Sequence, residues 1–301
     1  MAEKLYAGIE AVGTKFVCII ASGPSDIRAK IQIKTTTPEE TLAQVTAFFK
    51  KELARQDVAR AGIGSFGPLE LDPDSQAYGF ITTTPKPGWA QVNLAGIIHR
   101  ELGLPVRIDT DVNAAALGEW RWGAARGLND FVYLTVGTGI GGGVFSGGKL
   151  VHGLIHPEIG HMLIRHDRTR DPYPGCCPAH ADCWEGLACG LAIKKRWGLP
   201  AEELPEGHPA WELEAYYLAQ GLMNLICTLS PRRIILGGGV IRASHLLPLV
   251  REQLTSLMGG YFQNPAITEG LDSYLIKPGL GDLAGVMGAI ALAEGVTEPE
   301  E

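Results

Sequence analysis

The stretch Gly8-Ile9-Glu10-Ala11-Val12-Gly13-Thr14-Lys15 decides the fold expected for this chain. A β-rich run, Leu5–Ile9, leads into a turn, and Lys15–Ile20 is expected to return as the second strand of a hairpin. The tripeptide Val-Gly-Thr of this turn recurs at residues 136–138, where the expected strand Phe131–Val136 ends. A hairpin with the same turn at the start and in the middle of a chain predicts two related halves.

Helical and strand patterns alternate between and after these hairpins. Pro38-Glu39-Glu40 predicts a helix start, because proline suits the first turn and acidic side chains suit the positive end of the helix dipole. Asp111 stands where the buried strand Val106–Asp109 gives way to a helix that runs to Trp122. Further elements are expected as helices at about 94–102, 212–229, 243–258 and 283–294, and as strands at 61–66 and 233–236. The alternation predicts an α/β fold with mixed sheets.

Composition narrows the classes of function. The 301 residues carry 26 Lys and Arg against 33 Asp and Glu, a net charge of −7. This balance disfavours a nucleic-acid binder, and no apolar run reaches the roughly 18 residues of a membrane span. Six cysteines without a secretory signal predict free thiols and a cytoplasmic protein. The 39 glycines, about 13% of the chain against the usual ~7%, cluster beside short apolar runs, as in loops that approach a ligand.

The two hairpin turns are candidate phosphate sites. In the first turn, the amides around Gly13, the Thr14 hydroxyl and the Lys15 ammonium can donate to phosphate, and Glu10 can hold Mg²⁺ through water. The second turn, Gly137–Gly139, offers the same chemistry without the acid. Neither turn has the spacing of a P-loop, and an ordinary hairpin turn stays open as the alternative for the first. Two such turns predict a nucleotide site split between two domains.

Two further positions allow either a purely structural or a functional interpretation. Asp111 either caps its helix or serves as the general base that accepts the proton of an attacking hydroxyl in phosphoryl transfer. The run Gly237-Gly238-Gly239 follows the strand Ile234–Leu236. It is either a tight turn or a place where adenine or ribose approaches the backbone closely.

Four soft ligands indicate a metal site. Cys177, His180 and Cys183 follow the pattern C-x2-H-x2-C, and His161 supplies a distant fourth ligand. Short loops with this spacing can close on one tetrahedral Zn²⁺, so we expect a structural zinc site. Cys176 is an adjacent rival to Cys177, which we prefer for its compact spacing. Free thiols are the alternative.

Two acids are tethered beside the expected metal. Glu158 precedes His161 by three residues, and Glu185 follows Cys183 by two. Carboxylates held in this way can accept hydrogen bonds from sugar hydroxyls. Spacing alone does not separate this interpretation from two surface charges.

The order of these motifs resembles the ROK family of sugar kinases from about residue 5 to 292, and most closely its bacterial fructokinases. The closer match rests on Ser65–Pro68, Tyr78–Trp89 and His156–His161. The resemblance implies an actin-like ATPase (ribonuclease H-like) fold of the α/β class, with two related domains around a central cleft. It also implies ATP, Mg²⁺ and a structural Zn²⁺ as cofactors.

The resemblance assigns roles to individual residues. Asp111 matches the catalytic aspartate. The zinc ligands are His161, Cys177, His180 and Cys183. The substrate side comprises Lys86, Glu158, His161 and Glu185. The nucleotide side comprises Glu10, Gly13, Thr14, Lys15, Thr138, Gly139, Ala188, Gly237, Gly238 and Gly239.

We therefore expect the phosphorylation of D-fructose by ATP to fructose 6-phosphate, and the resemblance favours a homodimer. A smaller N-terminal domain is expected at 1–113, a larger domain with the zinc loop at 114–282, and a C-terminal helix at 283–301 that returns to the N-terminal domain. Alternatives are a broader hexokinase acting on mannose or glucose, a catalytically silent zinc-stabilised scaffold, and a sugar-responsive ROK repressor. The first strand near Leu5 leaves no room for the repressor's N-terminal DNA-binding module, so we expect no nucleic-acid partner and no membrane partner.

Overall fold

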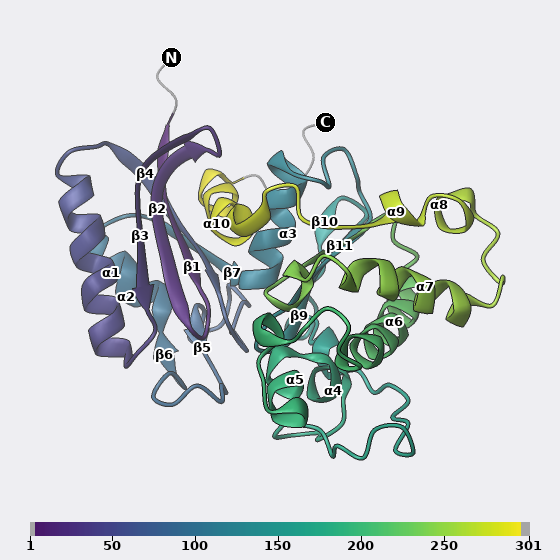
Figure 1. The fold of residues 1–301 in the computed structure, drawn as a ribbon. Helices are drawn as coiled ribbons and strands as arrows, with labels where there is room; N and C mark the ends of the chain where they lie inside the picture. The colour runs from purple at the N-terminus through teal and green to yellow at the C-terminus, as the bar shows by residue number, and fades with distance from the viewer. Residues whose placement is uncertain (1–3, 296–301) are drawn as a thin grey trace. The chain divides into compact units, whose positions relative to one another are not determined.

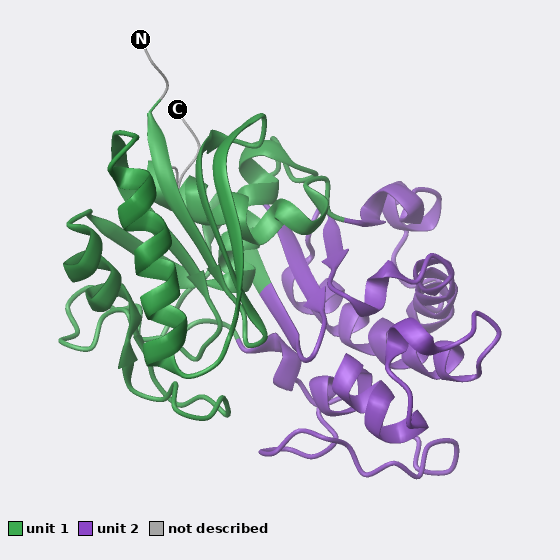
Figure 2. Ribbon diagram, turned by 60° about the vertical axis from the view of Figure 1, so that its left-hand side comes forward, with its two compact units in different colours: residues 1–129, 143–157, 278–301 green, residues 130–142, 158–277 purple. Residues whose placement is uncertain are grey.

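The structure, a computed structural model, describes residues 4–295 (Figure 1). Residues 1–3 and 296–301, the ends of two of the expected segments, lie outside the described part. The chain forms two compact units (Figure 2). Unit 1 comprises the residues up to 129, residues 143–157 and the residues from 278 onward, and unit 2 comprises residues 130–142 and 158–277. The domain bounds expected at residues 113 and 282 stay a prediction.

Unit 1 is built on a five-stranded mixed sheet. Its strands, in spatial order, are β3 (Asp26–Lys34), β2 (Lys15–Gly23), β1 (Leu5–Ala11), β4 (Val58–Ser65) and β7 (Val106–Thr110). β1 pairs antiparallel with β2 and parallel with β4. The helices of the unit are α1 (Pro38–Leu53), α2 (Leu94–Leu102), α3 (Asp111–Trp122) and α10 (Ala284–Glu294), which follows the 3-10 turn η4 (Gly281–Leu283). A small sheet pairs β5 (Phe80–Ile81) with β6 (Val92–Asn93).

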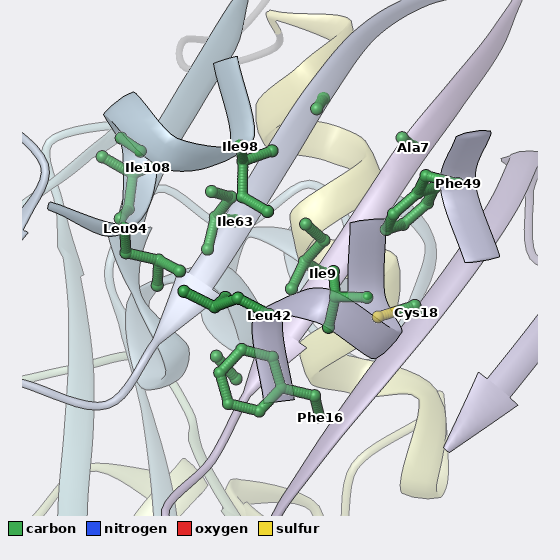
Figure 3. Packing of buried hydrophobic residues seen from close by; sticks show 14 of the residues in the cluster. Ala7, Ile9, Phe16, Cys18, Leu42, Phe49, Ile63, Leu94, Ile98 and Ile108 are labelled. Atoms are coloured by element: carbon green, nitrogen blue, oxygen red, sulfur yellow. The ribbon is translucent and has the colours of Figure 1, made fainter. Parts of the chain in front are cut away.

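One face of this sheet carries the larger hydrophobic core of the unit. Ile9, Phe16 and Ile63 of the strands pack with Leu42 of α1 and Leu94 of α2 (Figure 3). All five side chains are buried. Because successive side chains of a strand point to opposite faces, the alternate residues of β1 are left for the other face. Burial of one such side chain contributes about 1.5–3 kcal/mol, so this cluster holds α1 and α2 on the sheet.

The other face of the sheet meets α10 and α3 almost backbone to backbone. A Cβ added at Gly62 of β4 would lie 1.9 Å from the carbonyl oxygen of Ala289 in α10. A Cβ added at Gly288 of α10 would lie 1.6 Å from the carbonyl oxygen of Ala114 in α3. Only glycine fits at such distances. The beginning of α3, which carries Asp111, is therefore held closely against the strands of unit 1.

The second sheet carries the second glycine turn. Its strands, in spatial order, are β10 (Lys149–Leu150), β9 (Ile140–Ser146), β8 (Phe131–Val136), β11 (Ile234–Gly237) and β12 (Leu275–Ile276). β11 pairs parallel with both β8 and β12. The helices of unit 2 are α4 (Trp184–Ala188), α5 (Gly190–Trp197), α6 (Ala210–Leu229), α7 (Leu246–Met258), α8 (Pro265–Thr268) and α9 (Leu271–Tyr274). Its 3-10 turns are η1 (Ile159–His161), η2 (Ala201–Glu203) and η3 (Val240–Arg242).

The two sheets share one strand order. In each sheet the first strand of the hairpin is central, the next two strands of the chain lie to one side of it, and two later strands lie to the other side. The prediction of two related α/β halves, made from a shared tripeptide, is thereby confirmed. Among residues 4–295, no helix combines the length and the apolar character needed to cross a membrane.

The contact between α10 and α3 can be tested by adding one methyl group. We expect Gly288→Ala to lower the free energy of unfolding by about 1–3 kcal/mol or more, because the new Cβ would overlap backbone that cannot rotate away. Gly207→Ala is the matched control, since its Cβ would meet no atom within 4 Å. Urea denaturation measures both variants, and equal stability of the two would contradict the described packing.

Candidate active site

Asp111 is the first residue of α3, directly after β7. Thr110 caps the helix, because its hydroxyl oxygen accepts the Asn113 N–H at 3.1 Å. Asp111 Oδ1 accepts the Val112 N–H at 3.0 Å. Removal of water by the surrounding protein raises the pKa of Asp111 to about 6. Because Thr110 performs the capping, the Asp111 carboxyl keeps acceptor capacity for another partner.

Glu10 lies near the end of β1, on the face of the sheet that meets α10. A Cβ added at Gly285 of α10 would lie 2.2 Å from Glu10 Oε1. Burial, and after it the negative charge of Asp111, raises the pKa of Glu10 to about 7, and the positive charge of Lys15 opposes this rise. The structure therefore brings Glu10 into electrostatic contact with both Lys15 and the predicted base.

The first turn is closed by its own backbone. The Val12 N–H donates to the Lys15 carbonyl at 2.9 Å, and the Lys15 N–H donates to the Val12 carbonyl at 3.2 Å. The Thr35 hydroxyl also donates to the Val12 carbonyl at 2.9 Å. A Cβ added at Gly13 would meet no atom within 4 Å. Open space beside Gly13 and Thr14 suits the approach of a phosphate group.

A second polar group at the end of β7 was not predicted from the sequence. Asp109 Oδ1 accepts the Thr110 N–H at 2.7 Å and the Asn113 side-chain amide at 2.8 Å. Asp109 Oδ2 lies 2.9 Å from His152 Nε2, and this hydrogen bond raises the pKa of His152. His156 Nε2 accepts the Leu69 N–H at 3.0 Å, and burial lowers the pKa of this histidine.

The two histidines pin the loop that follows β10 to other elements of unit 1. His152 holds it at the end of β7 and His156 holds it at Leu69. The available sequence signal was a pair of histidines four residues apart, shortly before Glu158. The spacing alone names no partner, because Asp109 and Leu69 are distant in sequence.

Lys86 lies in the loop between β5 and β6. Its N–H donates to the Thr84 hydroxyl at 3.3 Å, and its carbonyl accepts the Trp89 N–H at 3.2 Å. The buried Trp89 indole donates to the Thr36 carbonyl at 2.9 Å and fixes this loop. Within residues 4–295, no hydrogen bond joins the Lys86 ammonium to another predicted site residue.

The second glycine turn is held by Glu185 and by the start of α5. The Ile140 N–H donates to Glu185 Oε2 at 2.9 Å. The Gly137 N–H donates to the Gly139 carbonyl at 2.9 Å, and the Gly190 N–H donates to the Gly137 carbonyl at 2.7 Å. Thr138 itself is exposed, and Ala188 is buried at the end of α4. Several of the predicted nucleotide residues of unit 2 therefore gather around one turn.

The glycine run after β11 reaches the same turn. Gly238 has a φ of +97°, and a Cβ there would lie 2.3 Å from the Val136 carbonyl oxygen at the end of β8. Glycine is required at this position both by the φ and by the close approach. Gly239, in contrast, is exposed beside open space. Gly237 ends β11, and Gly238 and Gly239 form a bend whose backbone lies next to the end of β8.

The four predicted metal ligands converge in unit 2. Cys177 Sγ lies 3.6 Å from His161 Nδ1 and 3.8 Å from His180 Nδ1, and Cys183 Sγ lies 3.6 Å from His161 Nδ1. All four ligand atoms lie within 4.8 Å of one another. Tetrahedral Zn²⁺ with bonds of about 2.0–2.3 Å separates its sulfur and nitrogen ligands by about 3.5–3.8 Å. The observed separations fit that ion.

The loop around the cluster is shaped by tight backbone contacts. The Cys177 N–H donates to the Ala181 carbonyl at 3.1 Å, and the Ala181 N–H donates back to the Cys177 carbonyl at 2.9 Å. The Trp184 N–H donates to the Met162 carbonyl at 2.8 Å, which joins the two parts of the cluster. Of the two adjacent cysteines, Cys177 belongs to this cluster, as predicted, whereas Cys176 lies against Cys189.

Glu158 precedes the 3-10 turn η1 and His161 is its last residue, and the His161 N–H donates to the Glu158 carbonyl at 3.0 Å. Glu158 is exposed and His161 is half-buried. His161 directs Nδ1 at both thiols of the cluster. Its Nε2, on the opposite side of the ring, is left for a second partner.

The sequence matches one protein family over nearly its whole length. The family model described as "ROK family" matches residues 6–296. The chain belongs to the ROK family. It is 46% identical over 296 residues to a fructokinase of Zymomonas mobilis, covering 97% of each chain. It is 42% identical to a putative fructokinase of Bacillus subtilis, covering 98% of this chain and 97% of the relative. A glucokinase of Halalkalibacterium halodurans is 26% identical, with 96% and 94% covered.

Solved ROK structures share the fold. A glucokinase from Streptomyces griseus, crystallised with glucose and AMPPNP, superposes with a TM-score of 0.76 at 25% identity, covering 97% of this chain and 99% of that one. This likeness and the matching strand order of the two sheets confirm the predicted actin-like ATPase fold.

Removal of one thiol tests the metal cluster. We expect elemental analysis to find about one zinc per chain, and Cys183→Ser to lose it, because serine is a poor ligand for a structural zinc. The melting temperature should fall by roughly 5–10 °C, the scale of a loss of about 3 kcal/mol in a protein of this size. Cys227→Ser, which alters an exposed cysteine of α6, is the control. Zinc retained by Cys183→Ser would remove this residue from the ligand set.

Proposed function

We propose that this chain transfers the γ-phosphoryl group of ATP to the 6-hydroxyl of D-fructose, giving fructose 6-phosphate and ADP. The observation that carries the proposal is the Asp111 carboxyl at the first residue of α3, whose pKa of about 6 keeps it ionised at neutral pH. Fructose is preferred as substrate because the two fructokinases share 42–46% identity with the chain, against 26% for the glucokinase.

Asp111 acts as the general base in this proposal. Its ionised carboxylate accepts the proton of the 6-hydroxyl while that oxygen attacks the γ-phosphorus. The bond from this phosphorus to the bridging oxygen breaks, and ADP leaves. A general base contributes about 10²–10⁴-fold to the rate. Positioning and charge stabilisation supply the remainder in phosphoryl transfer.

The phosphate groups are assigned to the two glycine turns. The amides of Gly13 and Thr14, with the Lys15 ammonium, donate to one part of the triphosphate, and the Thr138 turn donates to another. Mg²⁺, when bound, neutralises charge on the transferred group. Glu10 and Asp111 fit such an ion because carboxylate oxygens are its preferred ligands and because the Asp111 charge raises the pKa of Glu10, a repulsion that a cation relieves.

The sugar is assigned to Glu158, His161, Glu185 and Lys86. Glu185 has one oxygen on the Ile140 amide, which orients the other for a sugar hydroxyl. His161 would hold a zinc ion through Nδ1, which would fix the ring and leave Nε2 for a sugar hydroxyl. The zinc supplies rigidity to this part of unit 2. The homodimer expected from the resemblance stays a prediction.

A sugar panel separates fructose from the alternative substrates. With ATP and Mg²⁺, we expect kcat/KM for fructose to exceed the values for mannose and glucose by about tenfold or more, the scale set by a few hydrogen bonds made to one sugar only. A coupled assay of ADP release measures this. Equal or higher kcat/KM values for mannose or glucose would show that the protein is a broader hexokinase. No ADP release with any of the sugars would show that it is a catalytically silent scaffold.

Asp111→Asn tests the base. We expect kcat to fall by about 10²–10⁴-fold, with KM for fructose and the melting temperature little changed, because asparagine keeps the shape but binds no proton. In the wild type, kcat/KM should fall about tenfold per pH unit below about pH 6, where Asp111 takes up a proton and stops acting as a base.

Asp57→Asn is the matched control, since Asp57 is exposed just before β4. It should leave kcat and the pH profile unchanged. Wild-type turnover by Asp111→Asn would exclude Asp111 as the base.

A further inference from the structure

We propose that Cys176 and Cys189 form a dithiol site that hydrogen peroxide, or another hydroperoxide, converts to a disulfide. The two Sγ atoms lie 3.8 Å apart in unit 2. A disulfide bond measures about 2.05 Å, so the two sulfur atoms have to approach each other by about 1.8 Å. Both are free thiols in the structure.

This pair is separate from the metal cluster although Cys176 precedes a ligand. The Cys176 N–H donates to the Gly186 carbonyl at 3.0 Å, and the Cys177 N–H donates to the Ala181 carbonyl at 3.1 Å. Successive residues of an extended segment point to opposite sides. Cys177 therefore faces His161 and His180, and Cys176 faces Cys189.

The exposure of the two thiols differs in the way a peroxide-sensitive pair requires. Cys176 is partly exposed, so a small oxidant reaches it. Cys189 is 1% exposed, so it is shielded from the oxidant but lies next to its partner. Exposure decides which thiol is oxidised first, and a neighbouring thiol decides whether the product becomes a disulfide. Cys176 is thus the attacking thiol and Cys189 the resolving one.

The chemistry consumes one hydrogen peroxide per pair. The Cys176 sulfur, as thiolate, attacks one oxygen, the O–O bond breaks, hydroxide leaves and Cys176 becomes a sulfenic acid. The Cys189 sulfur then attacks the Cys176 sulfur, the S–O bond breaks, and the oxygen leaves as water with the proton of the second thiol. The pair loses two electrons and two protons, and the peroxide is reduced to two waters.

The site is connected to the second glycine turn. Cys189 Sγ accepts the Ala192 N–H at 3.4 Å and so caps α5. The next residue, Gly190, donates its N–H to the Gly137 carbonyl at 2.7 Å. A disulfide draws the Cys189 sulfur toward Cys176 and away from the cap. This consequence rests on the proposed function: if the turn binds ATP, the oxidised enzyme has a several-fold higher KM for ATP at similar KM for fructose.

Peptide mapping of the full-length, zinc-loaded protein tests the site. After hydrogen peroxide treatment and digestion without reductant, we expect one cross-linked peptide pair that joins Cys176 to Cys189. Dithiothreitol should reverse it, and zinc should stay bound. Cys176→Ser and Cys189→Ser should each abolish the cross-link, and Cys227→Ser, at an exposed cysteine, should not.

The proposal is overturned if the cross-link joins Cys177 or Cys183 with release of zinc, or if Cys176 accumulates as sulfinic acid with no cross-link. An unchanged KM for ATP in the cross-linked enzyme would refute the connection to the turn. A cross-link formed in a protein without kinase activity would refute the proposed function and leave the dithiol site standing.

Discussion

Unit 1 depends on one packing constraint, the close approach of backbone at Gly62 and Gly288, where α10 meets β4 and α3. Gly62 and Gly288 let backbone approach backbone at distances that a single methyl group would prevent. Glu119, buried near the end of α3, accepts the N–H groups of Gly279 and Leu280 at 2.9 Å and ties the segment before α10 to the same helix. The first residue of α3 is consequently fixed, and with it the Asp111 carboxyl.

The electrostatics of this position follow from the same packing. Glu10 and Asp111 lose water against α10 and α3, and their pKa values rise to about 7 and about 6. Two carboxyls with raised pKa values, beside one lysine, are poised for a cation and for a proton. In unit 2 the organising interaction is different. There, Cys177, Cys183 and two histidines converge beside Glu158, which precedes η1, and beside Glu185 of α4.

The sequence supports prediction where the signal is local. The two glycine hairpins, the helix that begins at Asp111 and three of the four ligands of the cluster depend on residues a few positions apart. The structure adds His161, which lies 16 residues before Cys177, to these three ligands. β3 was missed although Ile27, Ala29, Ile31 and Ile33 alternate with polar residues, a pattern that predicts a strand with one buried face. The contact of His152 with Asp109 was missed because it joins residues 43 apart, which no spacing rule connects.

We propose above all that the chain moves a phosphoryl group to one hydroxyl of fructose with Asp111 as base. Phosphorus NMR of a reaction with ATP, Mg²⁺ and fructose tests it most directly, because it reports the position of the transferred group. The account predicts a single sugar phosphate esterified at carbon 6 in equal amount to ADP, and neither product above background with Asp111→Asn. Phosphate at carbon 1, inorganic phosphate as the main product, or undiminished transfer by Asp111→Asn would contradict it.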